Sequence, residues 1–203
     1  MNNEKKKFLL RAVFCGFILA VTASFFPFAA ASAELSDQVV RLHIVANSDS
    51  EEDQRVKLLV RDAVLQEAAN WYGDAKTLEE ANAALCVHLG AIKSAANEAL
   101  QNSGSSDRAK VQMTDQYFPT RDYEDFSFPA GKYRTLKITI GEGKGHNWWC
   151  VVFPALCLPA AEEDAFSTLT QAQRELVQKP ERYQVKFKAL EWYEALRQAL
   201  DFS

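Results

Sequence analysis

The sequence has few glycines and prolines and no repeated unit. Eight Gly and six Pro among 203 residues exclude a collagen-like or low-complexity chain. It also lacks a tract of like charges and any repeat of about 20 to 50 residues, which excludes solenoids and propellers. With 48% hydrophobic and 25% charged residues, the composition is that of a globular protein.

Basic residues are scarce beyond the N-terminus. Residues 1–33 hold four of the 23 Lys and Arg and one of the 27 Asp and Glu. The other 170 residues therefore carry 19 basic and 26 acidic side chains, a net charge of −7. Binding to nucleic acid or anionic lipid needs clustered Lys and Arg that displace counterions. An acidic chain of this kind is a poor candidate for either ligand, and we expect no nucleic-acid partner.

The N-terminus has the pattern of an export signal. Four basic residues come first: Lys5, Lys6, Lys7 and Arg11. An uncharged stretch of 22 residues follows and closes with Ala31-Ser32-Ala33, the small-x-small pattern of a cleavage site. We predict a signal peptide over residues 1–33, with an extracytoplasmic domain over residues 34–203 that meets the membrane only through the N-terminal segment during export. The alternative is an uncleaved anchor, because 22 apolar residues are enough to cross a bilayer.

The cysteines give no sign of a metal or redox site. Cys86, Cys150 and Cys157 remain after residue 33, without a Cys-x-x-Cys pair or a nearby pair of histidines. We therefore predict no metal and no cofactor. An odd number of cysteines in an exported protein allows one internal bridge at most. Our hypothesis is a disulfide between Cys150 and Cys157, and the alternative is that both are buried thiols.

The hydrophobic periodicity predicts a single α+β domain. Alternating apolar residues indicate strands over residues 39–46, 110–117, 136–140 and 148–153. Apolar residues three and four apart indicate helices over about 50–72 and 77–102 and two further helices near the C-terminus, whose apolar positions run over 166–177 and 183–200. Residues 119–131 read as a loop. The expected order is β-α-α-β-β-β-α-α, with helices packed on a mostly antiparallel sheet of about four strands.

Gly141-Glu142-Gly143-Lys144-Gly145 is glycine-rich but does not have the context of a phosphate-binding loop. Such a loop precedes a helix, whose N-terminal N–H groups bind the phosphate. Here a strand is predicted to follow, so the segment is interpreted as a hairpin turn.

Two segments supply candidate interface residues. Adjacent tryptophans on a strand face opposite sides of the sheet, so one can fill the core while the other needs a cover. That cover is either a helix of this domain or a partner protein, since tryptophan is enriched in binding hot spots. A polar run after the first strand is the second segment, and its Ser and Asp side chains also suit a helix cap. The candidates are His43, Asn47, Ser48, Asp49, Asn147, Trp148, Trp149 and Phe153.

An enzyme is the less favoured interpretation. His43, Asp49 and either Ser48 or Ser50 could in principle form a hydrolase constellation acting on cell-wall material. A serine nucleophile needs a sharp exposed turn such as Gly-x-Ser-x-Gly, and the sequence has none. We therefore predict that the protein is not an enzyme and has no catalytic residues.

Several blocks resemble one known family. They are Arg41-Leu-His-Ile-Val-Ala-Asn-Ser-Asp-Ser-Glu-Glu-Asp-Gln54, Lys57-Leu-Leu-Val-Arg-Asp-Ala-Val64, Gly145-His-Asn-Trp-Trp-Cys-Val-Val-Phe-Pro-Ala-Leu-Cys157 and Val185-Lys-Phe-Lys-Ala-Leu-Glu-Trp192. Together they resemble stage II sporulation protein R. One departure is Ala155, where the family pattern has a second proline.

The resemblance implies a role in signalling between the two cells of a sporulating bacterium. A protein of this family is made in the forespore and exported into the space between the two membranes. There it triggers a membrane-embedded aspartic protease of the mother cell, which removes the pro-sequence of the sigma-E precursor. The implied partner is the extracytoplasmic part of that protease, and the implied role is that of an activator.

Overall fold

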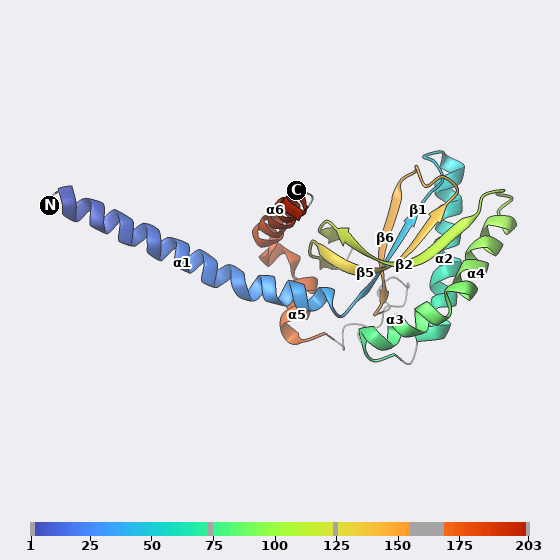
Figure 1. Ribbon diagram of the computed structural model, residues 1–203, viewed down its shortest axis with the longest axis horizontal. Coiled ribbons are helices and arrows are strands. Elements are labelled where there is room, and N and C mark those ends of the chain that lie inside the picture. Colours follow the sequence, from blue (N-terminus) through green and yellow to red (C-terminus); the bar gives the residue numbers. More distant parts are fainter. Residues whose placement is uncertain (1–2, 73–74, 124–125, 155–168, 202–203) are drawn as a thin grey trace. The chain divides into compact units, whose positions relative to one another are not determined.

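The computed structural model describes residues 3–72, 75–123, 126–154 and 169–201 (Figure 1). In chain order, its helices and strands are α1 (Asn3–Ser36), β1 (Val40–Val45), α2 (Glu51–Tyr72), α3 (Leu78–Val87), α4 (Leu89–Asn102), β2 (Ala109–Phe118), β3 (Arg121–Asp122), β4 (Ser127–Phe128), β5 (Gly131–Ile140), β6 (Asn147–Phe153), α5 (Gln171–Gln178), a 3₁₀ turn (Pro180–Arg182) and α6 (Gln184–Asp201).

The chain forms two compact units. The first contains Met1–Glu34, Pro119–Gly131 and Ala172–Ser203, and so includes nearly all of α1, the small sheet β3–β4 and helices α5 and α6. The second contains Leu35–Phe118 and Lys132–Gln171, and so includes the four-stranded sheet with α2, α3 and α4. The predicted removal of residues 1–33 as a signal peptide would take away most of α1 from the first unit, and this cleavage stays a prediction.

The four-stranded sheet has the order β2-β5-β1-β6 and is mixed. β1 pairs with β5 in parallel, with Val40 opposite Arg134. It pairs with β6 antiparallel, with Leu42 opposite Cys150. The α+β class is confirmed, but the prediction of a mostly antiparallel sheet is partly wrong. Parallel neighbours need a long crossover, and α2, α3, α4 and β2 supply it between β1 and β5.

The Gly141–His146 connection joins β5 to β6, but it is not the predicted hairpin because β1 lies between these two strands. The connection crosses the end of β1 instead. The backbone N–H groups of Lys144 and Gly145 donate to the carbonyl oxygens of Asn47 and Ala46, at 3.1 and 2.9 Å. The sequence marks the turn correctly, but it does not show that a strand from a distant part of the chain inserts between the two strands that the turn links.

The central strand β1 is buried on both faces, although apolar and polar residues alternate along part of it. All six of its residues are buried. Leu42 and Ile44 belong to the hydrophobic core shared with α2, α3 and α4, and these three helices lie together on one side of the sheet (Figure 1). Arg41 and His43 point to the other face, where aromatic side chains of β2, β5 and β6 cover them. The polar members of the alternation are therefore interior residues.

The predicted helix over 50–72 is confirmed as α2, and the predicted capping is present. The backbone N–H of Asp53 donates to the Ser50 hydroxyl at 3.1 Å. The helix predicted over 77–102 is instead two helices, α3 and α4, which meet at His88. The His88 ring stacks on Trp71 of α2 with a centroid distance of 3.6 Å. The apolar side chains of α3 and α4 belong to one core, although the two helices are separated at His88. The spacing of apolar residues by three and four continues through this break, so the sequence pattern does not reveal it.

Smaller differences concern the first unit. The predicted loop over 119–131 contains the two short paired strands β3 and β4, where the Ser127 hydroxyl donates to Asp122 at 2.6 Å. α5 begins only at Gln171, and Phe166, which marks the start of that predicted pattern, lies outside the described residues. The final helix is confirmed as α6.

One prediction concerns the disulfide. Cys150 is disulfide-bonded, whereas Cys15 and Cys86 are free and exposed. Cys157 lies outside the described residues, so its pairing with Cys150 stays a prediction. In the denatured but unreduced protein we expect a thiol reagent to modify Cys86 at once and Cys150 only after reduction, as read by peptide mass spectrometry. Modification of Cys150 before reduction would contradict the bridge.

A second prediction concerns the β5–β6 connection. A Cβ atom at Gly145 would collide with the backbone carbonyl of Ser48, whereas a Cβ at Gly90 in α4 meets no atom within 4 Å. Gly145→Ala should therefore lower the free energy of unfolding by about 1–3 kcal/mol, as other overpacked sites do. Gly90→Ala is the matched control and should be neutral or stabilising by up to about 1 kcal/mol. Denaturant unfolding of both variants measures the difference, and equal stabilities would contradict the close packing.

Candidate functional site

Two candidate segments meet where the connection after β1 touches the connection between β5 and β6. We call this region the turn surface, and it consists of Asn47, Ser48, Asp49, Glu142, Lys144 and His146. Asn47 fixes the two connections side by side, because its side-chain oxygen accepts a hydrogen bond from the Glu142 N–H at 2.9 Å. The family-like blocks that begin at Arg41 and Gly145 are thus brought to one end of the sheet.

Asp49 and His146 form an exposed contact of the turn surface. The Asp49 carboxylate accepts a hydrogen bond from the His146 backbone N–H at 2.6 Å, and the same oxygen lies 2.5 Å from His146 Nδ1. The two side chains are 56% and 76% exposed. Both are therefore oriented by the fold and remain available to a partner.

The buried side chain of Lys57 bonds to the residue that carries this contact, His146. Lys57 of α2 donates to the His146 carbonyl oxygen at 3.1 Å and to Gln54 Oε1 at 2.5 Å. Burial lowers the pKa of Lys57 because it removes water from the ammonium group, and the nearby Asp49 carboxylate partly opposes this. The amine therefore ties the β5–β6 connection to α2.

Ser48 and Asn47 bind a carboxylate of the first turn of α2. The Ser48 hydroxyl donates to Asp53 Oδ2 at 2.5 Å, and the Asn47 amide donates to the same oxygen at 3.2 Å. These bonds favour the ionised carboxylate and lower the pKa of Asp53, with the Ser48 hydroxyl as the largest cause and burial opposing it. The polar run after β1 is thus a helix-capping network as well as part of the surface.

His43 lies on the other face of the sheet, inside an aromatic cluster. Its ring stacks on Trp149 with a centroid distance of 4.0 Å and an interplanar angle of 4°, and Phe118 meets both rings edge-on. Its Nδ1 is 3.0 Å from Gln116 Oε1, and its Nε2 is 2.7 Å from Asn147 Oδ1. His43 therefore joins β1 to β2 and β6 and is buried.

Trp148 and Phe153 are directed to the helical side of the sheet. Trp148 packs against the hydrophobic core, and the Arg61 guanidinium of α2 lies 4.5 Å from its ring centroid. Phe153 is only 6% exposed and belongs to the same core. The two tryptophans do face opposite sides, and residues of the second unit contact each of them.

The candidates thus divide into two groups. Asn47, Ser48 and Asp49 belong to the turn surface, and Asn147 connects it to His43. His43, Trp148, Trp149 and Phe153 are packed within the second unit. Sequence reasoning missed Lys57, Gln116 and the pairing of His146 with Asp49. The acidic residue and the histidine are 97 positions apart, and no local pattern connects them.

The hydrolase constellation is not assembled by these contacts. Both ring nitrogens of His43 have amide oxygens as partners, and the Asp49 carboxylate bonds to His146. Ser48 donates to Asp53. Within the described part of the chain, no group of three or more His, Cys, Asp or Glu side chains could hold a metal ion.

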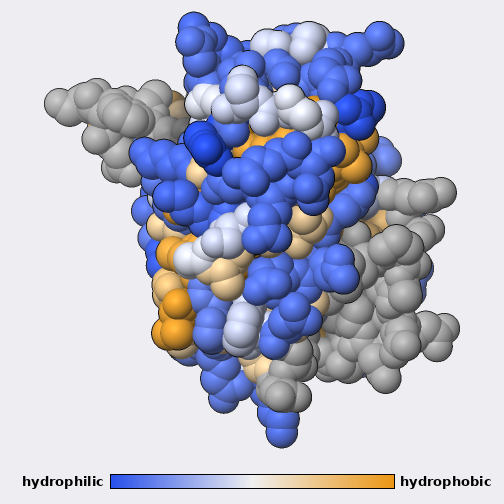
Figure 2. All heavy atoms as spheres, turned by 90° about the vertical axis from the view of Figure 1, so that its right-hand side faces the viewer, coloured by the Kyte–Doolittle hydropathy of each residue, from blue (hydrophilic) through white to orange (hydrophobic). Residues whose placement is uncertain are grey.

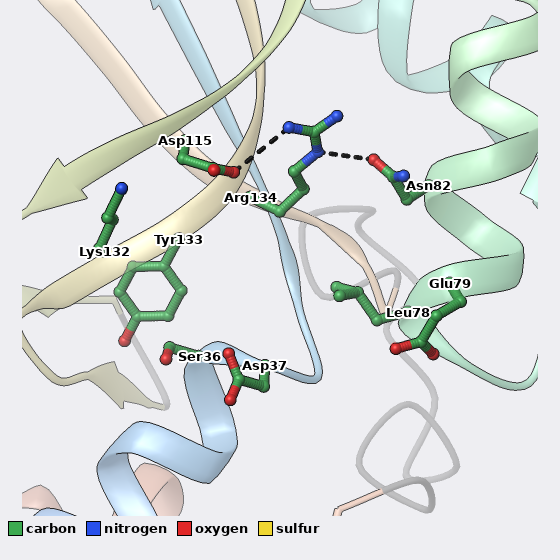
Figure 3. A pocket seen from close by; sticks show the side chains of 9 residues that line it. All are labelled: Ser36, Asp37, Leu78, Glu79, Asn82, Asp115, Lys132, Tyr133 and Arg134. Atoms are coloured by element: carbon green, nitrogen blue, oxygen red, sulfur yellow. Dashed lines mark hydrogen bonds and ion pairs between the residues drawn. The ribbon is translucent and has the colours of Figure 1, made fainter.

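A separate cavity of about 310 Å³ lies in the second unit, at the opposite end of β5 from the turn surface (Figure 3). Arg134 lines it and joins α3 to β2, with Nε 2.7 Å from Asn82 Oδ1 and Nη1 3.3 Å from Asp115 Oδ1. Lys132, Asp37 and Glu79 add charges of both signs to its lining. The guanidinium thus has a side-chain partner on each of two elements, α3 and β2.

A prediction follows from the capping network. Because the pKa of Asp53 is lowered in the folded protein, its stabilising contribution is present above the ordinary aspartate value of about 4 and is lost as pH falls through the folded value. Ser48→Ala should raise the pKa of Asp53 in an NMR titration. It should also reduce stability at neutral pH by roughly 0.5–1.5 kcal/mol, a deficit that shrinks at acid pH.

Glu191 of the first unit is the internal reference for that titration. Burial opposes its ionisation, but hydrogen bonds from Lys188 and Thr120 outweigh this and lower its pKa. Its titration should be the same in both proteins. An unchanged Asp53 titration in Ser48→Ala would show that the short hydroxyl contact does not exist in solution.

Comparison with known proteins agrees with the sequence motifs. The family model of stage II sporulation protein R (spore_II_R) matches residues 36–163. The stage II sporulation protein R of Bacillus subtilis (strain 168) is 42% identical over 123 residues, which are 61% of this chain and 55% of that protein. The chain thus spans about half the length of that relative, and no solved structure matches it. The matched range contains β1, the turn surface and β6, and the chain belongs to the stage II sporulation protein R family.

Proposed function

We propose that this sporulation protein is an exported signal that activates a membrane-embedded aspartic protease of the mother cell. The protease would then process the sigma-E precursor. The activator would bind the extracytoplasmic part of the protease from the space between forespore and mother cell. Family membership supports a sporulation role, and the remaining support comes from the N-terminal helix and from the turn surface.

The N-terminal helix supports export. The stretch Lys5–Ser36 is long and apolar enough to cross a membrane, and a signal sequence has the same properties. Its large apolar side chains from Phe8 to Phe26 are mostly exposed. Such a surface suits a bilayer or a translocation channel and does not suit water. We retain residues 1–33 as the predicted signal peptide, with an anchor as the alternative.

The observation that carries the proposal is the meeting of two family-like blocks at the turn surface. Asp49 and His146 come from different blocks, are exposed, and are held by backbone and side-chain hydrogen bonds. A surface that is already ordered loses little conformational freedom on binding. We therefore assign Asp49 and His146 to partner contact, and assign His43 and Trp149 to holding the surface in place from within the sheet.

A reconstitution tests the activity. The full chain, the candidate protease and the sigma precursor are expressed together in a heterologous bacterium, and cleavage is followed by immunoblot. We expect cleavage with the full chain and none when residues 1–33 are deleted, because that form stays in the producing compartment. Absence of cleavage with all three proteins present and this one folded would overturn the proposal.

Variants in the same assay test the surface. Asp49→Asn combined with His146→Ala should reduce cleavage at least tenfold, equivalent to about 1.4 kcal/mol of binding, while the melting temperature changes little. Asp62→Asn is the matched control, because Asp62 is 60% exposed and also forms a surface ion pair, with Arg61 of α2. Equal activity of the two variants would remove the turn surface from the interface.

A further inference from the structure

Helix α6 has a buried face and an exposed face, and both are apolar. Phe187 and Leu190 are 4% and 6% exposed and pack within the first unit. On the other side the exposed fractions are large: Val185 83%, Trp192 71%, Tyr193 55%, Leu196 61% and Leu200 65%. At 3.6 residues per turn these five positions fall within an arc of about 100°. They form one continuous stripe along the helix, which we call the α6 stripe.

Water is an unfavourable solvent for the α6 stripe. Contiguous apolar surface on a soluble protein marks a contact with a partner or a membrane. The face of the molecule drawn in Figure 2 has a different character, because it is largely hydrophilic with only small hydrophobic areas. We therefore expect the α6 stripe to contact either a partner protein or a membrane. The contacts on the opposite face of α6 indicate which of the two it is.

The buried side of α6 packs on the far end of α1. The Phe28 ring of α1 lies 5.5 Å from Phe187 and 5.9 Å from Tyr183, centroid to centroid. Lys186 Nζ donates to the Ser24 carbonyl oxygen at 2.9 Å. Phe28 is 4% exposed, so this end of α1 is a packed part of the first unit.

The distance of this contact from Arg11 along α1 indicates where α6 would lie relative to a membrane that α1 crosses. The uncharged stretch begins after Arg11, and a helix rises 1.5 Å per residue, so Ser24 and Phe28 lie roughly 20 to 25 Å beyond that arginine. The hydrocarbon core of a bilayer is about 30 Å thick. When α1 crosses a membrane from Arg11, the start of α6 is therefore held close to the opposite membrane surface.

We propose that, in the form of the protein that keeps residues 1–33 as an anchor, α6 lies on the membrane surface with the α6 stripe inserted among the lipids beside α1. Trp192 and Tyr193 suit this position, because their rings are apolar and their N–H and O–H groups can remain in the headgroup layer. Arg197 flanks the stripe with a side chain that is 60% exposed and can extend toward water, whereas Lys186 bonds to α1. The attraction is hydrophobic, which agrees with the acidic composition of the chain. The membrane contact is thereby extended beyond the N-terminal segment.

Tryptophan fluorescence tests the position of α6 directly. The four tryptophans are Trp71, Trp148, Trp149 and Trp192, so α1 has none and its insertion adds no signal. The full chain is reconstituted into phosphatidylcholine vesicles with or without bromine on the acyl chains, which quenches tryptophan only within the lipid. We expect clear quenching of the native chain, and a loss of most of that quenching in Trp192→Phe. Trp71→Phe is the control and should be quenched like the native chain.

Two matched substitutions that each introduce a carboxylate test the insertion of the α6 stripe in a second way. Val185→Glu places a carboxylate in the α6 stripe, whereas Val87→Glu places one on α3 at a residue that is 76% exposed. Val185→Glu should reduce bromine quenching severalfold, and Val87→Glu should leave it unchanged. Neither exposed side chain supports the core, so both variants should fold.

The outcomes separate the possible occupants. Equal emission in brominated and plain vesicles, with the protein shown to float with them, would overturn the proposal and leave the α6 stripe for a protein partner. Quenching that survives Trp192→Phe would also overturn it, because another tryptophan would then be the one in the lipid. The assay contains neither protease nor sigma precursor, so its result is independent of the proposed signalling activity.

Discussion

The insertion of β1 between β5 and β6 is the constraint on which the second unit depends. A strand with a neighbour on each edge and side chains packed on each face leaves no polar group in contact with water, so each must find a partner inside the protein. It also forces the β5–β6 connection to pass over the end of β1. The turn surface exists because of that crossing, since it places His146 beside Asp49 and Lys144 beside Asn47.

Two buried cations hold this arrangement, and both bind backbone carbonyl oxygens at or next to β6. Arg41 Nε donates to the Cys150 carbonyl at 3.0 Å, and its guanidinium lies 4.4 Å from the Phe118 ring centroid. Lys57 donates to the His146 carbonyl. Removing water from a charge is costly, and aromatic faces and carbonyl dipoles compensate for it only in a fixed geometry. The two cations therefore define the position of β6 against β1 and α2.

The sequence predicted the helices and strands well, because periodicity reports which side of an element meets apolar neighbours. It could not predict what covers the second side. Arg41 and His43 look like solvent-facing positions of an alternating strand, and only the aromatic residues of β2, β5 and β6 make them interior. The same limit applies to the site. Asn47, Ser48 and Asp49 were found from their residue types, whereas the contribution of Lys57 depends on a contact between residues 89 positions apart.

The position of β1 in the chain has a consequence for the order of folding. β1 is synthesised before both of its neighbours, and its first parallel partner, Arg134 opposite Val40, comes 94 residues later. Contacts between such distant residues form slowly, because the intervening chain must first be ordered. Until then, both edges of an apolar strand are open to other chains. Helices α2 to α4 are made in the interval, and in the folded protein they pack on one face of β1, so that face can be covered before the partners of its edges are synthesised.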